Sequence, residues 1–183
     1  MVFITGGVRS GKSAFAEYYA KKLYSVYNKK QLLYIASGVA IDDEMQARIE
    51  RHQKDRLESD IVWQTIEVSD VLPSQLEQFT TGTVILWDCI TTWLSNVLYK
   101  TENILGRNEA IQQYIVTFQQ QLMSWKASNV SVIIVSNEVL DEQKSHYADV
   151  ELYKKLLGEL SQWLVVFCDE AYEIDHKHVN RWK

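Results

Sequence analysis

The sequence predicts an α/β fold in three layers, in which a mainly parallel central sheet carries helices on both faces. Short runs that are apolar throughout alternate with segments of helical period, and polar residues follow several of these runs. Continuous apolar runs indicate strands buried on both faces, which is typical of parallel sheets. Because the chain has 183 residues and no internal repeat, we expect one domain over residues 1–183. Any ligand would then bind at the carboxyl edge of the strands.

The first strand, expected over residues 2–4, leads into a glycine-rich loop that is typical of P-loop NTPase-like folds. Residues 6–13 read Gly, four residues, Gly-Lys-Ser, and a helix is expected over residues 13–24. In this context the backbone N–H groups and the helix dipole would bind phosphate, while Lys12 would reach the outer phosphates and Ser13 would bind Mg²⁺. The alternative is a glycine-rich turn without a ligand. The residues expected to bind a nucleotide here are Gly6, Gly7, Val8, Arg9, Ser10, Gly11, Lys12 and Ser13.

A second strand is expected over residues 32–36, and a helix with an acidic first turn over residues 42–56. On this helix Arg48, His52 and Arg56 recur every four residues, which places them on one face. From the residues alone, a solvated helix face is the simpler interpretation. The alternative is a site in which two guanidinium groups flank a histidine.

A third strand is expected over residues 61–66, with Glu67 at its carboxyl end and a short helix over residues 70–79 after it. A fourth strand, over residues 83–88, ends in Asp88. An apolar strand followed by Asp is typical of the carboxylate that holds Mg²⁺ through water in phosphate-loop enzymes. Asp88 would equally well cap the next helix, and the two roles are compatible.

The second half of the chain continues the alternation of helices and strands. Residues 164–168 would alternatively form a strand, but the helical spacing upstream continues through them. His176 and His178 have no third ligand in view, so we interpret them as part of a surface tail and not as a metal site. The expected elements are helices over residues 91–98, 107–127 and 152–167, and strands over residues 130–135 and 171–174.

Composition narrows the class of protein. The net charge of −5 and the absence of a lysine/arginine block argue against nucleic acid as the main partner. Cys89 and Cys168 are not paired in a metal spacing, so we expect reduced, buried thiols, as in the cytoplasm. No leader segment and no run long enough to span a bilayer is recognisable, so we expect a soluble cytoplasmic protein.

Four segments together resemble one family closely, in register over roughly the first hundred residues. They are the phosphate loop from Thr5 to Ser13, the segment Tyr-Ile-Ala-Ser-Gly at residues 34–38, Asp-Asp-Glu-Met at residues 42–45 followed by Arg48, Ile49 and His52, and Asp-Cys-Ile-Thr-Thr-Trp-Leu-Ser-Asn at residues 88–96. The chain resembles the bifunctional adenosylcobinamide kinase / adenosylcobinamide-phosphate guanylyltransferase of cobalamin biosynthesis.

This resemblance implies two reactions. The enzyme would phosphorylate the corrinoid adenosylcobinamide with ATP or GTP, and would then transfer GMP from GTP through a covalent guanylyl-histidine that falls on His52. It also implies that Lys12 and Asp88 are catalytic, that Ser13 and Asp88 hold Mg²⁺ partly through water, that Glu67 lies near the guanylyl site, and that the protein is a homo-oligomer, by resemblance a trimer. The further nucleotide-binding residues implied are Ser37, Arg48, Arg51, His52, Arg56, Glu67 and Asp88.

The second half departs from the family pattern. Asn137-Glu138-Val139 is not followed by the usual glycine-rich loop ending in proline, and Ser161-Gln162 replaces a familiar Asn-Gln pair. The tail at residues 176–178 lacks the usual apolar, glycine-containing ending. Two alternatives therefore stay open: a diverged phosphate-loop kinase or nucleotidyltransferase with another acceptor, and a nucleotide-responsive regulatory protein without turnover.

Overall fold

The computed structural model describes residues 1–38, 46–47, 50, 54, 56, 61–138 and 147–183. Within these residues the strands form one sheet in the order β3-β2-β4-β5-β1-β6-β7. Neighbouring strands from β3 to β6 are parallel, and β7 alone runs antiparallel to its neighbour. The predicted mainly parallel α/β architecture is therefore confirmed. The strands are β1 (Val2–Gly6), β2 (Gln31–Ala36), β3 (Gln64–Glu67), β4 (Thr83–Asp88), β5 (Ser131–Val135), β6 (Glu170–Asp175) and β7 (His178–Arg181).

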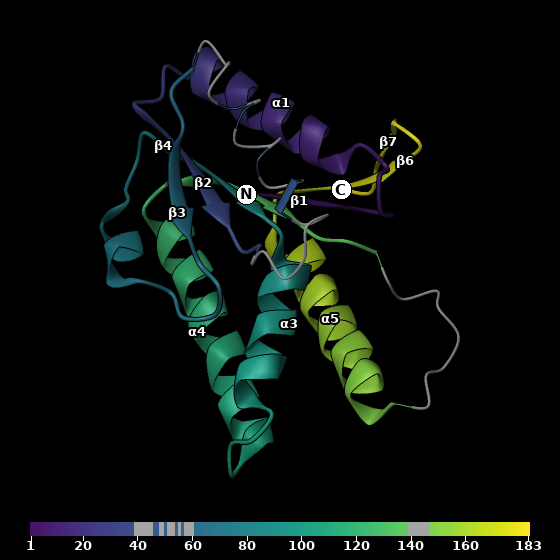
Figure 1. The fold of residues 1–183 in the computed structure, drawn as a ribbon. Coiled ribbons are helices and arrows are strands. Elements are labelled where there is room, and N and C mark those ends of the chain that lie inside the picture. The colour runs from purple at the N-terminus through teal and green to yellow at the C-terminus, as the bar shows by residue number, and fades with distance from the viewer. Residues whose placement is uncertain (39–45, 48–49, 51–53, 55, 57–60, 139–146) are drawn as a thin grey trace.

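Helices cover both faces of the sheet, as the three-layer prediction requires (Figure 1). One face packs against α1 (Lys12–Val26), whose small residues Ala16 and Ala20 are fully buried beneath it. The other face packs against α3 (Ile90–Thr101), α4 (Arg107–Ala127) and α5 (Ala148–Phe167). Successive strand residues point to opposite faces, so each strand contributes to both cores.

The core between the sheet and helices α3 to α5 is built around large aromatic rings. Phe118 stacks on Trp93 with 4.9 Å between ring centroids and meets Trp87 edge-on at 5.1 Å. The indole N–H of Trp87 donates to Ser37 Oγ at 2.8 Å, and that of Trp125 donates to the carbonyl of Leu76 at 2.9 Å. These buried N–H groups are satisfied, which is the condition for placing tryptophan in a core at low cost.

The predicted elements match the observed ones, with differences at several boundaries. The predicted helix over residues 70–79 is a short 3₁₀-helix, η1 (Ser74–Gln78), because Pro73 lies in an extended conformation before it and lacks an N–H. The strand predicted over residues 61–66 starts at Gln64, and α3 and α5 extend beyond the predicted ranges. Residues 164–167 are helical, as the sequence predicted in preference to a strand. Most of the helix predicted over residues 42–56 lies outside the described residues, and so do residues 139–146, where the sequence departs from the family pattern.

The segment interpreted as a surface tail forms a further strand, so that interpretation was wrong. Asp175 pairs with His178, which leaves His176 and Lys177 as a two-residue hairpin turn. Both turn residues have positive φ, 46° and 68°, as a type I′ turn requires. The sequence lacks the Asn-Gly or Gly residues by which such a turn is usually recognised.

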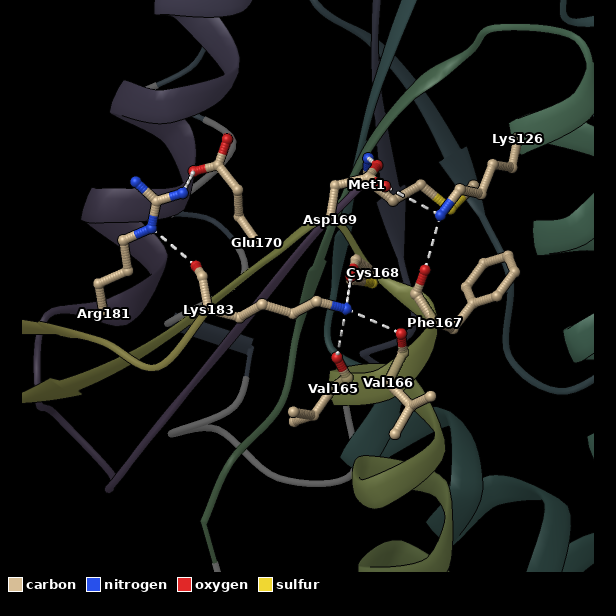
Figure 2. A network of polar contacts seen from close by, with 10 residues as sticks. All are labelled: Met1, Lys126, Val165, Val166, Phe167, Cys168, Asp169, Glu170, Arg181 and Lys183. Carbon is tan, nitrogen blue, oxygen red and sulfur yellow. Dashed lines mark hydrogen bonds and ion pairs between the residues drawn. The ribbon is translucent and has the colours of Figure 1, made fainter.

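Polar contacts fasten this hairpin and the end of α5 together (Figure 2). Lys183 Nζ donates to the carbonyl oxygens of Val165, Val166 and Cys168, at 3.3, 2.9 and 2.6 Å. Asp169 accepts from the amino group of Met1 at 2.6 Å and from Lys126 Nζ at 3.0 Å.

No helix among the described residues is both long and apolar enough to cross a bilayer.

Candidate active site at the carboxyl edge of the sheet

The predicted phosphate loop connects β1 to α1 and is closely packed at both of its ends. A Cβ atom on Gly6 would lie 2.2 Å from the carbonyl oxygen of Ile174, so only glycine fits there without displacing β6. Gly11 has φ of 99° and caps α1 without a side-chain hydrogen bond. The first-turn N–H groups of α1 therefore have no side-chain cap, which is the arrangement that binds phosphate oxygens.

Lys12 and Ser10 place polar groups inside this loop. Lys12 is only 4 % exposed, and its ammonium donates to the carbonyl of Gly7 at 3.1 Å. Ser10 Oγ is buried and has no hydrogen-bond partner within the part of the chain that the structure describes. A buried hydroxyl without a partner indicates a polar group that is missing from the site. The loop thus offers a cation and several donors in one concave turn.

Two carboxylates lie at the same edge of the sheet, on strands that flank β2. Ala36 at the end of β2 is in register with Glu67 on β3 and with Asp88 on β4. Asp88 lies on the α1 side, because its register partners Ala36 and Val135 belong to the core against α1. The hydroxyl of Tyr34 donates to Asp88 Oδ2 at 3.3 Å. Burial and the adjacent Asp88 carboxylate raise the pKa of Tyr34, so this hydroxyl keeps its proton and remains a donor.

Arg56 places a positive charge against Tyr34, the residue that donates to Asp88. Its guanidinium lies over the Tyr34 ring, 3.7 Å from the centroid, and the residue is 7 % exposed. Its Nη1 has no hydrogen-bond partner among the described residues. A buried guanidinium with an unsatisfied N–H is suited to bind an anion. Arg48, Arg51 and His52, which the sequence places on the same helix, lie outside the described residues, so their roles stay predictions.

Ser37 is held away from this cluster. It is fully buried, and its hydroxyl accepts a hydrogen bond from the Trp87 indole, on the face covered by α3 and α4. The backbone carbonyl of Ser37 accepts a hydrogen bond from Asn96 at 3.0 Å. The contacts that the structure shows for Ser37 thus support the end of β2, and direct nucleotide binding by this residue stays a prediction.

A second polar cluster, which the sequence did not indicate as a site, joins the start of α3 to the end of β5. Cys89 Sγ lies 2.8 Å from Thr91 Oγ1, and the Asn137 amide donates to the same oxygen at 3.2 Å. Burial, followed by the neighbouring Asp88 charge, raises the pKa of the Cys89 thiol, so it stays neutral. The available signal was the run of polar residues 136–138 after a buried strand. This cluster fixes the backbone next to Asp88.

Ser13 and Asp88, which are predicted to hold Mg²⁺, fit a magnesium site in which the nucleotide phosphates supply some of the oxygen ligands. Among the described residues no group of three His, Cys, Asp or Glu side chains could hold a metal. Mg²⁺ in nucleotide sites typically takes one or two protein oxygens, and phosphate and water oxygens complete its octahedron. The Ser13 hydroxyl in the first turn of α1 and the Asp88 carboxylate offer such a pair.

Comparisons with known proteins agree in one description. The family model "Cobinamide kinase / cobinamide phosphate guanyltransferase" matches residues 2–176. The bifunctional adenosylcobalamin biosynthesis protein CobU of Escherichia coli (strain K12) is 29 % identical over 178 residues, which cover 94 % of this chain and 93 % of that protein. The protein CobP of the same description from Pseudomonas aeruginosa is 31 % identical over 155 residues, 80 % of this chain and 79 % of that protein. Among solved structures, a KaiC-like protein from Pyrococcus horikoshii aligns over all of this chain and 77 % of its own, with a TM-score of 0.45 and 12 % identity, a likeness too distant to add to the architecture described above.

Proposed function

The chain belongs to the cobinamide kinase / cobinamide phosphate guanyltransferase family, and we propose that it performs both reactions. It would phosphorylate adenosylcobinamide with a nucleoside triphosphate and then transfer GMP from GTP to the new phosphate, giving adenosylcobinamide-GDP. The observation that carries this proposal is the glycine loop with its buried Lys12, which lies at the same sheet edge as Asp88. That edge is where nucleotides bind in open α/β sheets.

The kinase step needs positioning and charge neutralisation more than covalent chemistry. The acceptor hydroxyl oxygen attacks the γ-phosphorus, the bond from the γ-phosphorus to the bridging oxygen breaks, and the nucleoside diphosphate leaves while the hydroxyl proton is released. Backbone N–H groups of the loop and the Lys12 ammonium would bind the phosphate oxygens. Ser13 and Asp88 would hold Mg²⁺, which supplies further neutralisation of the developing charge.

The guanylyl step uses His52 as the nucleophile. A neutral ring nitrogen attacks the α-phosphorus of GTP, the phosphorus–nitrogen bond forms, and pyrophosphate leaves. A phosphate oxygen of the acceptor then attacks the same phosphorus, and the phosphorus–nitrogen bond breaks. Cations are needed near the α-phosphate, and Arg56, buried with an unsatisfied N–H, supports this requirement. Arg48, Arg51 and Glu67 would complete the site.

The wider setting follows from the same family. We propose a cytoplasmic homo-oligomer, a trimer by resemblance, that uses Mg²⁺ with ATP, GTP or both and takes a corrinoid as acceptor. The net charge of −5 agrees with a small-molecule substrate, since nucleic-acid binding proteins carry basic surfaces.

A diverged acceptor is the second candidate, and one observation favours it. A hollow of about 430 Å³ between β1 and α5 is lined by Ser161 and Gln162, two of the positions that depart from the family pattern. Asn137 and Glu138 lie at the same hollow and Thr5 connects it to the phosphate loop. If the acceptor reaches this hollow, these substitutions would alter which molecule it accepts.

The first prediction tests the covalent step. Incubation with Mg²⁺ and GTP labelled at the α-phosphate should give one GMP adduct per chain, acid-labile and alkali-stable as a phosphoramidate is, and peptide mapping should place it on His52. His52→Ala should form no adduct yet still bind nucleotide, whereas Lys12→Ala should weaken nucleotide binding by at least tenfold, since a charge-assisted contact is lost.

Adding adenosylcobinamide phosphate should discharge the adduct. An adduct that forms on His52 but does not transfer to this acceptor would favour the diverged enzyme. The absence of an adduct, in a sample shown to bind GTP, would contradict the covalent mechanism.

A further inference from the structure

The turn of the C-terminal hairpin touches the phosphate loop, although the two segments lie at opposite ends of the chain. The backbone N–H of Lys177 donates to the carbonyl of Ser10 at 2.9 Å. The Lys177 side chain passes next to the loop's last glycine, since a Cβ atom on Gly11 would lie 3.4 Å from Lys177 Cγ. The carbonyl oxygen of Ile174, on the same hairpin, lies next to Gly6. Figure 1 shows β6 and β7 beside the start of α1.

The backbone of Lys177 is held in a conformation that lysine does not favour. His176 and Lys177 have φ values of 46° and 68°, a region that is uncommon for residues other than Gly, Asn, Asp and His. Non-glycine residues in such conformations gather at ligand-binding sites, where the surrounding structure enforces them. The hydrogen bond to Ser10 uses only the backbone of Lys177, so it would remain with glycine. The turn and its bond to Ser10 therefore do not require a lysine at this position.

The ammonium group of Lys177 has a free approach to a ligand. The residue is exposed, and within the described residues its ammonium forms no ion pair or hydrogen bond. The nearest acidic residue on the hairpin, Asp175, is paired with His176 at 2.6 Å. A cation thus lies beside the anion-binding end of α1.

The strand order decides which part of a nucleotide this cation would meet. β1 lies between β5 and β6, and Asp88 on β4 lies beyond β5, so Asp88 and the hairpin are on opposite sides of the phosphate loop. Asp88 would hold Mg²⁺, which would neutralise the outer phosphates, so these phosphates would lie on the Asp88 side of the loop. The inner phosphate and the nucleoside would then lead toward β6 and β7.

We propose that Lys177 is a nucleotide-binding residue, whose ammonium contacts the inner phosphate of the nucleotide held on the phosphate loop. This rests on the proposed function, since it requires that the loop bind a nucleoside di- or triphosphate. The hairpin that the sequence presents as a tail is then one wall of the nucleotide site.

Lys177→Gly tests this proposal without harming the turn. Glycine keeps the N–H bond to Ser10 and adopts the positive φ without strain, so the melting temperature should not fall. The dissociation constants of Mg²⁺–GTP and Mg²⁺–GDP, measured by calorimetry, should both rise about five- to tenfold at low salt, and the difference from the unchanged protein should shrink as salt is added. Lys177→Arg, which keeps the charge, should bind within about twofold of the unchanged protein.

His176→Asn is the matched control, because asparagine adopts positive φ readily, can still donate a hydrogen bond to Asp175, and leaves the Lys177 ammonium in place. It should leave both dissociation constants unchanged. Equal affinity of Lys177→Gly and the unchanged protein would overturn the proposal, and so would a loss seen with GTP but not with GDP. Lys12→Ala separates the two hypotheses: if it also binds GTP normally, the nucleotide does not occupy the loop, and the proposed function fails first.

Discussion

Gly6 lies where the phosphate loop leaves β1, and the space around it is set by a neighbouring strand. The carbonyl of Ile174 on β6 and the hydroxyl of Ser10 both lie within 3 Å of where a Cβ atom would be. Gly7, the next residue, has no heavy atom within 4 Å of its corresponding position. Two adjacent glycines in one motif therefore have different physical roles, one of close packing and one of open access.

We expect Gly6→Ala to lower the free energy of unfolding by about 2–3 kcal/mol, because the methyl group must displace the backbone of β6. Nucleotide binding should fall with it, since the displaced loop carries the phosphate-binding N–H groups. Gly7→Ala is the matched variant and should change the free energy of unfolding by less than about 0.5 kcal/mol. Urea unfolding of both variants checks this, and equal stability of the two would show that β6 moves aside freely.

At the scale of the elements, the C-terminal end of α5 is capped by the side chain of Lys183, which follows β7 in the chain. The last carbonyl groups of a helix have no partner within the helix, and a cation near them also interacts favourably with the helix dipole. Lys183 meets three carbonyl oxygens from residues 165–168 at this end. Arg181 holds the same segment, since its Nη2 lies 3.7 Å from Glu170 Oε2 and its Nε donates to the Lys183 carbonyl. The hairpin is thereby tied to α5 as well as to the sheet.

Lys183→Met should lower the free energy of unfolding by about 1 kcal/mol, since it removes the cation from these carbonyls while keeping an aliphatic chain. Lys155→Met serves as the control on the same helix. Lys155 is exposed and its ammonium is as far as 3.9 Å from Glu159 Oε1, so removing this ion pair should lower the free energy of unfolding by about 0.3 kcal/mol or less. Thermal unfolding of both variants compares them. A larger loss of stability for Lys155→Met than for Lys183→Met would contradict the proposed role of Lys183 at the C-terminal end of α5.

At the scale of the whole molecule, the core against α3, α4 and α5 buries groups that ionise only in alkali. Burial is the main cause that raises the pKa of Cys168 to about 11 and that of Tyr153 to about 12. Cys168 is 1 % exposed and belongs to the core against α3, α4 and α5. The folded state holds its proton more tightly than the unfolded chain does, so this contribution is complete below about pH 9 and is lost as the pH rises through 11.

We therefore expect the free energy of unfolding to fall more steeply between pH 9 and pH 11 in the unchanged protein than in Cys168→Ala. The difference in the fall should reach up to roughly 3 kcal/mol, the value of a two-unit shift. Urea titrations at pH 8, 9, 10 and 11 measure both slopes, and the constant cost of the missing sulfur cancels in the comparison. Parallel pH profiles would show that the Cys168 thiol is not protected by the fold.

Local patterns in the sequence determined the kind and order of the elements. The helix predicted over residues 107–127 matches α4 at both ends, because its apolar stripe and its bounds are set by residues close together in the chain. The parallel sheet, the helices on both faces and the phosphate loop follow from similarly local signals, and the family resemblance assigned roles to residues such as Asp88.

Tertiary structure alone decided which distant residues meet. The strand order placed Glu67 and Asp88 on either side of Ala36, and packing placed Arg56 over Tyr34. β7 escaped prediction because its turn lacks glycine and is stabilised by contacts with the rest of the fold, among them the bond from Lys177 to Ser10, 167 residues apart in the chain. Periodicity and turn chemistry act over a few residues, whereas such pairings depend on the free energy of the assembled sheet and cores.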